Sequence, residues 1–190
     1  MKYLSRFIWE TKSNQKQSTS SFMKKSMLTL LMLISLVGFG QTAVQEINEQ
    51  VWKPFTQAIM NQDVDKFISL HSKDLVRAER NDKQVLSYNQ YKTAMEQSWP
   101  KWKESNKKSN VRYTFELRFL ERISNETQAF EVGYFKNETI NPNGEKRVSF
   151  GQFHVALRKE NGMWKILVDS DSNNGRTITE EMFLAAKPIE

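Results

Sequence analysis

The chain has 190 residues, of which 38% are hydrophobic and 26% are charged. This length suits one ordinary domain with a tail, and the apolar fraction excludes a wholly disordered chain. The sequence has no cysteine, which excludes a disulfide framework, a thiolate zinc site and a cysteine nucleophile. The net charge of +6 invites a nucleic-acid hypothesis until the charges are located.

An uncharged run of 13 residues, 27–39, follows a pair of lysines near the start of the chain. It is shorter than the roughly 20 apolar residues of a transmembrane helix. A basic flank, a short apolar run and a small-x-small pattern ending at Gly40 are typical of a secretory signal peptide. We predict that residues 1–40 are an N-terminal extension and signal peptide, cleaved after Gly40, with translation starting at Met1 or Met23. The domain is then periplasmic or extracellular, and an uncleaved membrane anchor is the alternative.

The excess positive charge lies in this leader. Residues 1–40 hold six of the 28 basic and one of the 22 acidic residues, a net charge of +5, and the remaining 22 basic and 21 acidic residues leave +1. One lysine cluster, at 101–108, is interpreted as a solvated helix end or loop. We therefore expect no nucleic-acid partner, and membrane contact only through the uncleaved signal.

The first part of the domain is predicted to be helical. An apolar stripe recurs at helical spacing through Val44, Ile47, Val51, Phe55 and Ile59. Pro54 lies inside this stripe and removes one backbone donor, so we expect a kink and not a break. A second, short helix is predicted after the cap residue Asp63. His71 stands at its end, and a brief strand over 75–80 follows.

A third helix is predicted from the capping-box pattern of Ser87 and Gln90. Pro100 is expected to bend or terminate its last turn. Its stripe is unusually aromatic and consists of Tyr88, Tyr91, Met95, Trp99 and Trp102. Such a stripe either packs against a sheet as ordinary core or forms one wall of an apolar pocket.

From residue 110 the apolar period becomes two, which indicates strands with one buried face. The predicted buried positions of the first two long strands are Val111, Tyr113, Phe115, Leu117 and Phe119, then Gln128, Phe130, Val132, Tyr134 and Ile140. In the third strand the phase changes across Gly151, from Phe150 to Phe153, which predicts a β-bulge.

The end of the chain is predicted to hold one more strand and a helix. Asn161-Gly162 predicts a tight hairpin, and the strand after it buries Trp164, Ile166 and Val168. A capping-box pattern at Thr177 and Glu180 predicts a short helix. We place the domain at 43–172 and a C-terminal tail at 173–190.

Helices followed by hairpin-linked strands predict an α+β fold, with the helices on one face of a curved antiparallel sheet. Two segments, 55–74 and the hairpin 154–169, resemble the nuclear transport factor 2-like superfamily. The similarity covers 43–172 and is greatest to small exported SnoaL-like proteins of bacteria. It implies a cone-shaped, cystatin-like sheet wrapped around N-terminal helices. That superfamily includes isomerases, polyketide cyclases, dehydratases and binding modules, so the resemblance implies no single activity.

Candidate site residues fall into two groups. For ligand binding they are Tyr88, Tyr91, Trp99, Trp102 and Tyr113. For catalysis they are Asp169, His71 and His154. Asp169 is out of phase with Trp164, Ile166 and Val168 in the last strand. The two histidines lack metal-ligand spacing, and no phosphate loop or nucleophile elbow occurs, so we expect neither a metal nor a cofactor. Glu79, beside Arg77 and Arg80, is interpreted as part of a surface ion pair.

Three hypotheses follow. The preferred one is an exported binding module that holds a small apolar or amphipathic molecule against the aromatic residues. The second is an enzyme of the isomerase, polyketide cyclase or dehydratase type in the same pocket. The third is a homodimeric interaction or structural module. An enclosed pocket with two titratable groups within hydrogen-bond reach favours the enzyme.

Overall fold

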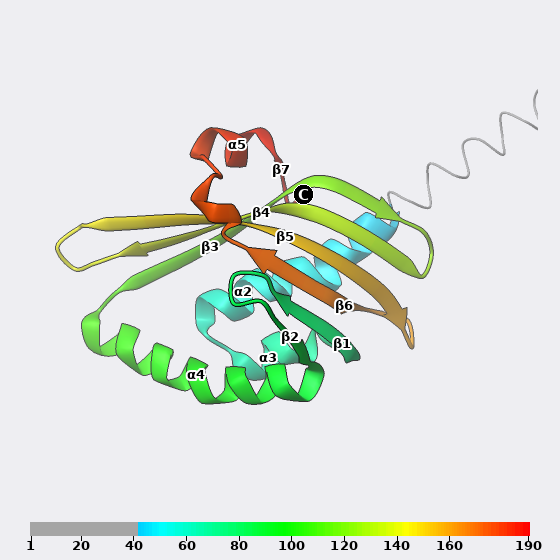
Figure 1. Cartoon of the computed structure of the whole chain (residues 1–190), viewed down its shortest axis with the longest axis horizontal. Helices are drawn as coiled ribbons and strands as arrows, with labels where there is room; N and C mark the ends of the chain where they lie inside the picture. The colour runs from blue at the N-terminus through cyan, green and yellow to red at the C-terminus, as the bar shows by residue number, and fades with distance from the viewer. Residues whose placement is uncertain (1–41) are drawn as a thin grey trace, which may run out of the picture. The chain divides into compact units, whose positions relative to one another are not determined.

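The computed structural model describes residues 42–190, and the predicted leader lies outside the described residues (Figure 1). The chain is helical over 42–47 and continues through a π-helix, η1 (Asn48–Trp52), into α2 (Lys53–Asn61). The backbone N–H of Lys53 donates to the carbonyl of Asn48 in the wide π turn. Pro54 then stands in the first turn of α2, where a missing N–H is tolerated. The predicted continuation without a break is confirmed, and a π turn precedes the proline.

The remaining helices begin at side-chain caps. α3 (Val64–Ser69) starts at Asp63, whose carboxylate accepts from the backbone N–H of Lys66 at 3.0 Å. α4 (Tyr88–Ser109) starts at the predicted capping box, where the N–H of Ser87 donates to Gln90 at 2.9 Å. Pro100 does not terminate α4, because the carbonyl four residues earlier lies on an exposed turn that water reaches. The helix ends nine residues later at Ser109, and its C-cap Asn110 has a left-handed conformation.

Seven strands form one sheet in the order β2-β1-β6-β5-β4-β3-β7. Their bounds are β1 (His71–Glu79), β2 (Gln84–Ser87), β3 (Arg112–Ser124), β4 (Gln128–Ile140), β5 (Lys146–Glu160), β6 (Met163–Ser172) and β7 (Lys187–Pro188). β1 and β6 pair in parallel, and the other neighbours are antiparallel. His71 therefore begins a strand, contrary to its predicted place at a helix end. β2 and β7 were not predicted.

The sheet carries a large core on one face and a small core on the other. The N-terminal helices, α3 and α4 cover one face, which we call the inner face, and α5 (Glu180–Ala185) lies against the outer face (Figure 1). Side chains less than 2% exposed in the large core include Trp164 and Ile166. The small core contains Tyr134, Ile178, Phe183 and Ala186, with Phe150 packed against it. None of the helices within 42–190 is long and apolar enough to cross a membrane.

The prediction of which face of β4 is buried is wrong. Phe130 is 42% exposed, whereas its neighbour Glu131 is fully buried on the inner face. Tyr134, also predicted to be inward, packs under α5 on the outer face. The second core explains the error, because it places large apolar side chains on both faces of one strand.

The predicted bulge at Gly151 is also wrong. β4 and β5 pair without a register shift from Gln128↔Arg158 to Ile140↔Lys146. Phe150 faces outward under α5, and Gly151 occupies an inner position beneath Phe135, where a Cβ atom would lie 2.0 Å from the ring. The apolar residues of β5 therefore change phase because α5 covers the outer face at Phe150, and not because the strand has a bulge.

The last helix starts later than predicted. Thr179, not Thr177, caps α5, and its hydroxyl accepts from the backbone N–H of Met182 at 3.2 Å. Thr177 instead donates to the carbonyl of Asn174 at 2.7 Å in a short 3-10 turn, η2 (Asn174–Arg176). This turn lets the chain cross the outer face before β7 joins β3.

Candidate functional site

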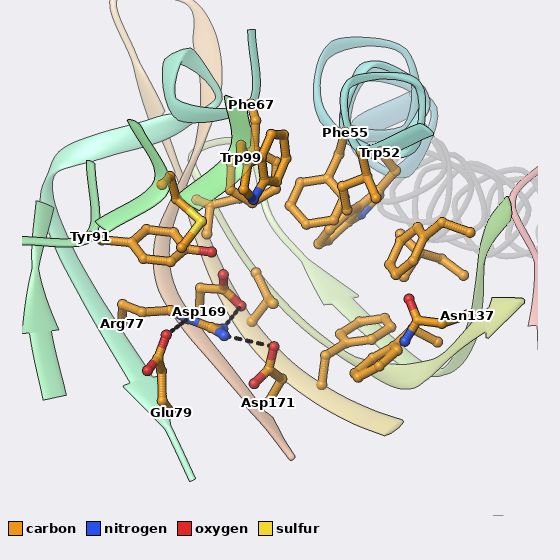
Figure 2. A pocket seen from close by; sticks show the side chains of 18 of the residues that line it. Trp52, Phe55, Phe67, Arg77, Glu79, Tyr91, Trp99, Asn137, Asp169 and Asp171 are labelled. Atoms are coloured by element: carbon orange, nitrogen blue, oxygen red, sulfur yellow. Dashed lines mark hydrogen bonds and ion pairs between the residues drawn. The ribbon is translucent and has the colours of Figure 1, made fainter. Parts of the chain in front are cut away.

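A cavity of about 340 Å³ lies between the inner face of the sheet and the helices (Figure 2). Most of its wall is apolar and aromatic, contributed by Trp52, Phe55, Ile59, Phe67, Met95, Trp99, Trp102, Phe115, Leu117, Phe135, Phe153, Val155 and Ile166. The polar lining residues are Arg77, Glu79, Tyr91, Tyr113, Asn137, Asp169 and Asp171. An apolar cavity with a few converging polar groups is the usual form of a small-molecule site.

Arg77 is the centre of the polar cluster. Its Nη1 lies 3.0 Å from Asp169 Oδ1, and its Nη2 donates to Asp171 Oδ2 at 2.8 Å. Its Nε lies 3.7 Å from Glu79 Oε1. The parallel pairing of β1 with β6 sets Arg77 beside Asp169 and Glu79 beside Asp171. Figure 2 shows these four side chains gathered on one side of the cavity.

A register shift in β6 brings the two aspartates to this face. Leu157 of β5 pairs with Ile166, whereas the preceding Ala156 pairs with Val168, so Leu167 is an extra residue on β6. Such a bulge reverses the alternation of the residues after it. Asp169 and Asp171 therefore line the same cavity as Ile166, although the uninterrupted sequence pattern places Asp169 on the opposite face.

His71 supports the cluster from behind. The residue is 3% exposed, and its ring packs against Phe67 and Tyr91. Its Nδ1 lies 2.9 Å from the carbonyl oxygen of Phe67, so this nitrogen carries a proton and donates it. Its Nε2 lies 3.7 Å from Asp169 Oδ2. His71 does not line the cavity itself, and at 3.7 Å its Nε2 makes no hydrogen bond with Asp169.

The two aspartates have opposite pKa shifts. Burial raises the pKa of Asp171, and repulsion from Asp169 and Glu79 adds to this, against the attraction of Arg77. Burial also acts on Asp169, but Arg77 and His71 outweigh it and hold the pKa of Asp169 below its usual value. Asp169 is therefore a fixed anion, and Asp171 is the carboxyl group more ready to take up a proton.

Two tyrosine hydroxyls face the cavity as neutral groups. Burial raises the pKa of Tyr91 far above its usual value, and the Arg77 guanidinium carbon lies 5.2 Å from the Tyr91 ring centre. Figure 2 shows the Tyr91 hydroxyl pointing toward Asp169. Burial raises the pKa of Tyr113 to about 12, and its hydroxyl donates to Asn137. Both hydroxyls therefore keep their protons near neutral pH.

Comparison with known proteins identifies the fold. No protein-family model and no curated protein matches the sequence. Solved structures do match, among them a ketosteroid isomerase-like protein from Erwinia carotovora atroseptica, 15% identical over 66% of this chain and 92% of that chain, with a TM-score of 0.50. A nuclear transport factor 2-like protein of unknown function from Pseudomonas putida is 15% identical over 69% and 87%, also at 0.50. The chain has the nuclear transport factor 2-like fold.

A third similar structure is the association domain of C. elegans calcium/calmodulin-dependent protein kinase II. It is 16% identical over 70% of this chain and 97% of that chain, with a TM-score of 0.51. At these identities the similarity shows the nuclear transport factor 2-like fold alone.

Within this fold, four of the five aromatic candidates line the cavity, namely Tyr91, Trp99, Trp102 and Tyr113. Tyr88 does not, and its hydroxyl accepts from Lys73 at 2.7 Å outside the cavity. Contact of the four with a ligand stays a prediction. Among the described residues, no group of three or more histidine, aspartate or glutamate side chains is arranged to hold a metal ion.

The three catalytic candidates separate in the structure. Asp169 lines the cavity, and His71 lies directly behind it. His154 is on the outer face, where its Nδ1 lies 3.4 Å from Arg80, and burial together with Arg80 lowers its pKa. His154 is therefore separated from the cavity by the sheet, and the structure gives it no part in the site.

The sequence pattern did not indicate Arg77, Asp171 or Asn137, and Glu79 was assigned to a surface ion pair and not to the site. Arg77 is only 7% exposed, so its interpretation in a surface ion pair is wrong. One signal was present, because Arg77 and Glu79 alternate along one strand and Asp169 and Asp171 along another. Their convergence depends on a parallel strand pair that the sequence pattern does not indicate.

Proposed function

We propose that this domain binds a small amphipathic molecule in the cavity. The observation that carries the proposal is one cavity with an aromatic wall on one side and the Arg77 cluster on the other. The aromatic side chains leave about 340 Å³ open, within the range of small-molecule sites. The wall supplies apolar contact area, and the cluster supplies polar groups that orient a ligand.

Ligand occupancy is tested with a matched pair of tryptophan variants. Met95 lines the cavity, whereas Met163 is an exposed residue of β6 outside it. We expect the neutral fluorescent probe N-phenylnaphthylamine to bind the wild type and Met163→Trp, and to lose at least about tenfold in affinity for Met95→Trp, whose added ring fills the space. Native mass spectrometry of protein purified from its own source should also show a co-purified small molecule.

Two results would contradict ligand binding in the cavity. Probe binding that is unchanged in Met95→Trp places the bound molecule elsewhere on the chain. Absence of probe binding and of any co-purified molecule, in protein with a sharp thermal unfolding transition, overturns the binding function.

A second candidate is an enzyme that moves a proton on a bound carbonyl compound. The observation that favours it is that Asp171, whose pKa is raised, and the neutral Tyr91 hydroxyl line the same cavity. A carboxylate base could take up the α-proton of a bound ketone, and a hydroxyl donor could stabilise the resulting enolate oxygen. The bicyclic ketone tetralone tests this through α-proton exchange in D₂O followed by NMR. We expect exchange to slow by about a hundredfold in Asp171→Asn. Exchange equal to that of buffer alone rejects the enzyme.

Export and pairing are proposals of a different kind. We propose that the domain acts outside the cytoplasm, on the strength of the predicted leader. We also propose a homodimer formed through the outer face, where Ile123 and Phe130 pair across β3 and β4 and are 58% and 42% exposed. Sedimentation equilibrium tests pairing, and Phe130→Glu should shift a dimer toward monomer.

A further inference from the structure

The cavity has an excess of negative charge at its polar side. Arg77 is the one basic residue among those of the described chain that line it, and it faces three carboxyl groups, those of Glu79, Asp169 and Asp171. We propose that the cavity selects a cationic amine, an ammonium group on an apolar body, over neutral and anionic molecules of the same shape. This ligand class rests on the proposed binding function and makes it more specific.

Arg77 is not available to an anionic ligand. Two of its nitrogens are directed at Asp169 and Asp171, at 3.0 and 2.8 Å. Its side chain is 8% exposed, so it has little free surface for another partner. A carboxylate or phosphate entering the cavity would meet the surrounding carboxyl groups and not a free guanidinium.

Asp171 and Glu79 are the groups that an ammonium would meet. Their side chains are 32% and 24% exposed, compared with 9% for Asp169. Asp171 also has a raised pKa, caused first by its burial and in part by repulsion from Asp169 and Glu79. An ammonium has three donors and one positive charge, so it satisfies free carboxylate oxygens and relieves that repulsion.

The aromatic wall suits the same ligand. Tyr91 and Trp99 line the cavity together with the carboxyl groups (Figure 2), and the Tyr91 ring already has the Arg77 cation 5.2 Å from its centre. The faces of such rings attract cations, most strongly where water is excluded. The apolar body of the amine then lies along the rings of α2, α4 and β3.

Three probes of matched shape test the proposal, namely phenylbutylamine, phenylbutanol and phenylbutyrate. Binding to the full chain is measured by titration calorimetry near neutral pH. We expect the amine to bind at least about tenfold more tightly than the alcohol, and the acid most weakly. Asp171→Asn should reduce amine affinity by about tenfold and alcohol affinity by much less. Glu126→Gln removes a negative charge from the exposed β3–β4 turn and should change neither.

The outcomes separate the ligand class from the binding function. Equal binding of amine and alcohol, or preference for the acid, overturns the ligand class and leaves the binding function standing. Amine preference that persists undiminished in folded Asp171→Asn and Glu79→Gln variants also overturns the ligand class, because neither carboxylate then contributes to it. Failure of all three probes together with N-phenylnaphthylamine overturns both.

Discussion

At the scale of single residues, the carboxyl groups of Asp169 and Asp171 have different surroundings. Asp169 and Asp171 both contact Arg77, but Asp169 also faces His71 and has almost no exposed surface. Asp171 lies nearer to the open cavity and beside the third carboxyl group, Glu79. Their pKa values therefore shift in opposite directions, and their ionised forms affect stability with opposite sign.

This difference predicts unequal effects of two isosteric changes. The pKa of Asp169 is lowered in the fold, so its ionised form stabilises above about pH 4, and that contribution is lost as the pH falls through the folded pKa. The pKa of Asp171 is raised, so its ionisation costs stability at high pH, and the cost disappears on acidification. We expect Asp169→Asn to lose about 3 kcal/mol at pH 7 and Asp171→Asn less than about 1 kcal/mol, measured by urea unfolding. Equal losses of stability in the two variants would contradict the opposite pKa shifts of Asp169 and Asp171.

A second prediction at this scale concerns Gly151. A Cβ atom there would lie 2.0 Å from Cζ of Phe135, whose ring lines the cavity. We expect Gly151→Ala to destabilise the fold by about 2 kcal/mol through overpacking. Phe135→Leu in the same chain should restore part of the loss, because the smaller side chain makes room. Thermal unfolding of the single and double variants measures this, and a double variant no more stable than Gly151→Ala would rule out the contact as the cause.

At the scale of elements, the π-helix and the sheet are joined by one buried polar network. Trp52 of η1 donates its indole N–H to Glu131 of β4, which is fully buried. Arg122 of β3 pairs with Glu131 at 2.8 Å and donates to Asn48 of η1 at 2.7 Å. Burial raises the pKa of Glu131 against the pull of Arg122 and Trp52, so this carboxyl group depends on its partners.

Removal of the cation in this network should be costly. We expect Arg122→Met to destabilise the protein by about 3 to 5 kcal/mol, because it leaves Glu131 buried without a counter-charge. The matched change Arg112→Met, at an exposed position of the same strand, should stay within about 0.5 kcal/mol. Adding Glu131→Gln to Arg122→Met should recover part of the loss, since it removes the unpaired charge. Urea unfolding of the wild type, Arg122→Met, Glu131→Gln and the double variant measures the coupling, and additive losses would show that the pair does not interact.

At the scale of the whole molecule, both ends of the described chain cover apolar surface of the sheet. The N-terminal helices and α4 close the inner face, and α5 with β7 covers part of the outer face. Asn48 donates to a main-chain oxygen of Glu190, at 3.3 Å, so the first helical segment touches the last residue. Loss of either end would therefore expose apolar surface of the sheet.

The predicted leader gives one prediction at this scale. We expect the mature protein to begin at Gln41, because cleavage after Gly40 follows the small-x-small pattern. Intact-mass measurement of the protein from its own source checks this. A mass that begins at Met1 or Met23 contradicts the cleavage and supports the uncleaved anchor.

The sequence by itself determined the α+β class, the capping of α3 and α4, and the hairpin at Asn161-Gly162. These features depend on neighbouring residues: a cap bonds to the next turn, and the hairpin residues adopt positive φ values of 51° and 82°. The resemblance to the nuclear transport factor 2-like superfamily also correctly predicted that the sheet is curved.

Only the tertiary structure shows which polar side chains come together at the cavity. Asp169 turns inward because Leu167 is an extra residue in β6, and it meets Arg77 because β1 lies parallel to β6. Phe130 and Tyr134 could not be assigned to a face, because the outer core under α5 puts apolar residues on both sides of β4. Bulges and strand partners are set by contacts between residues distant in sequence, which a local period does not contain.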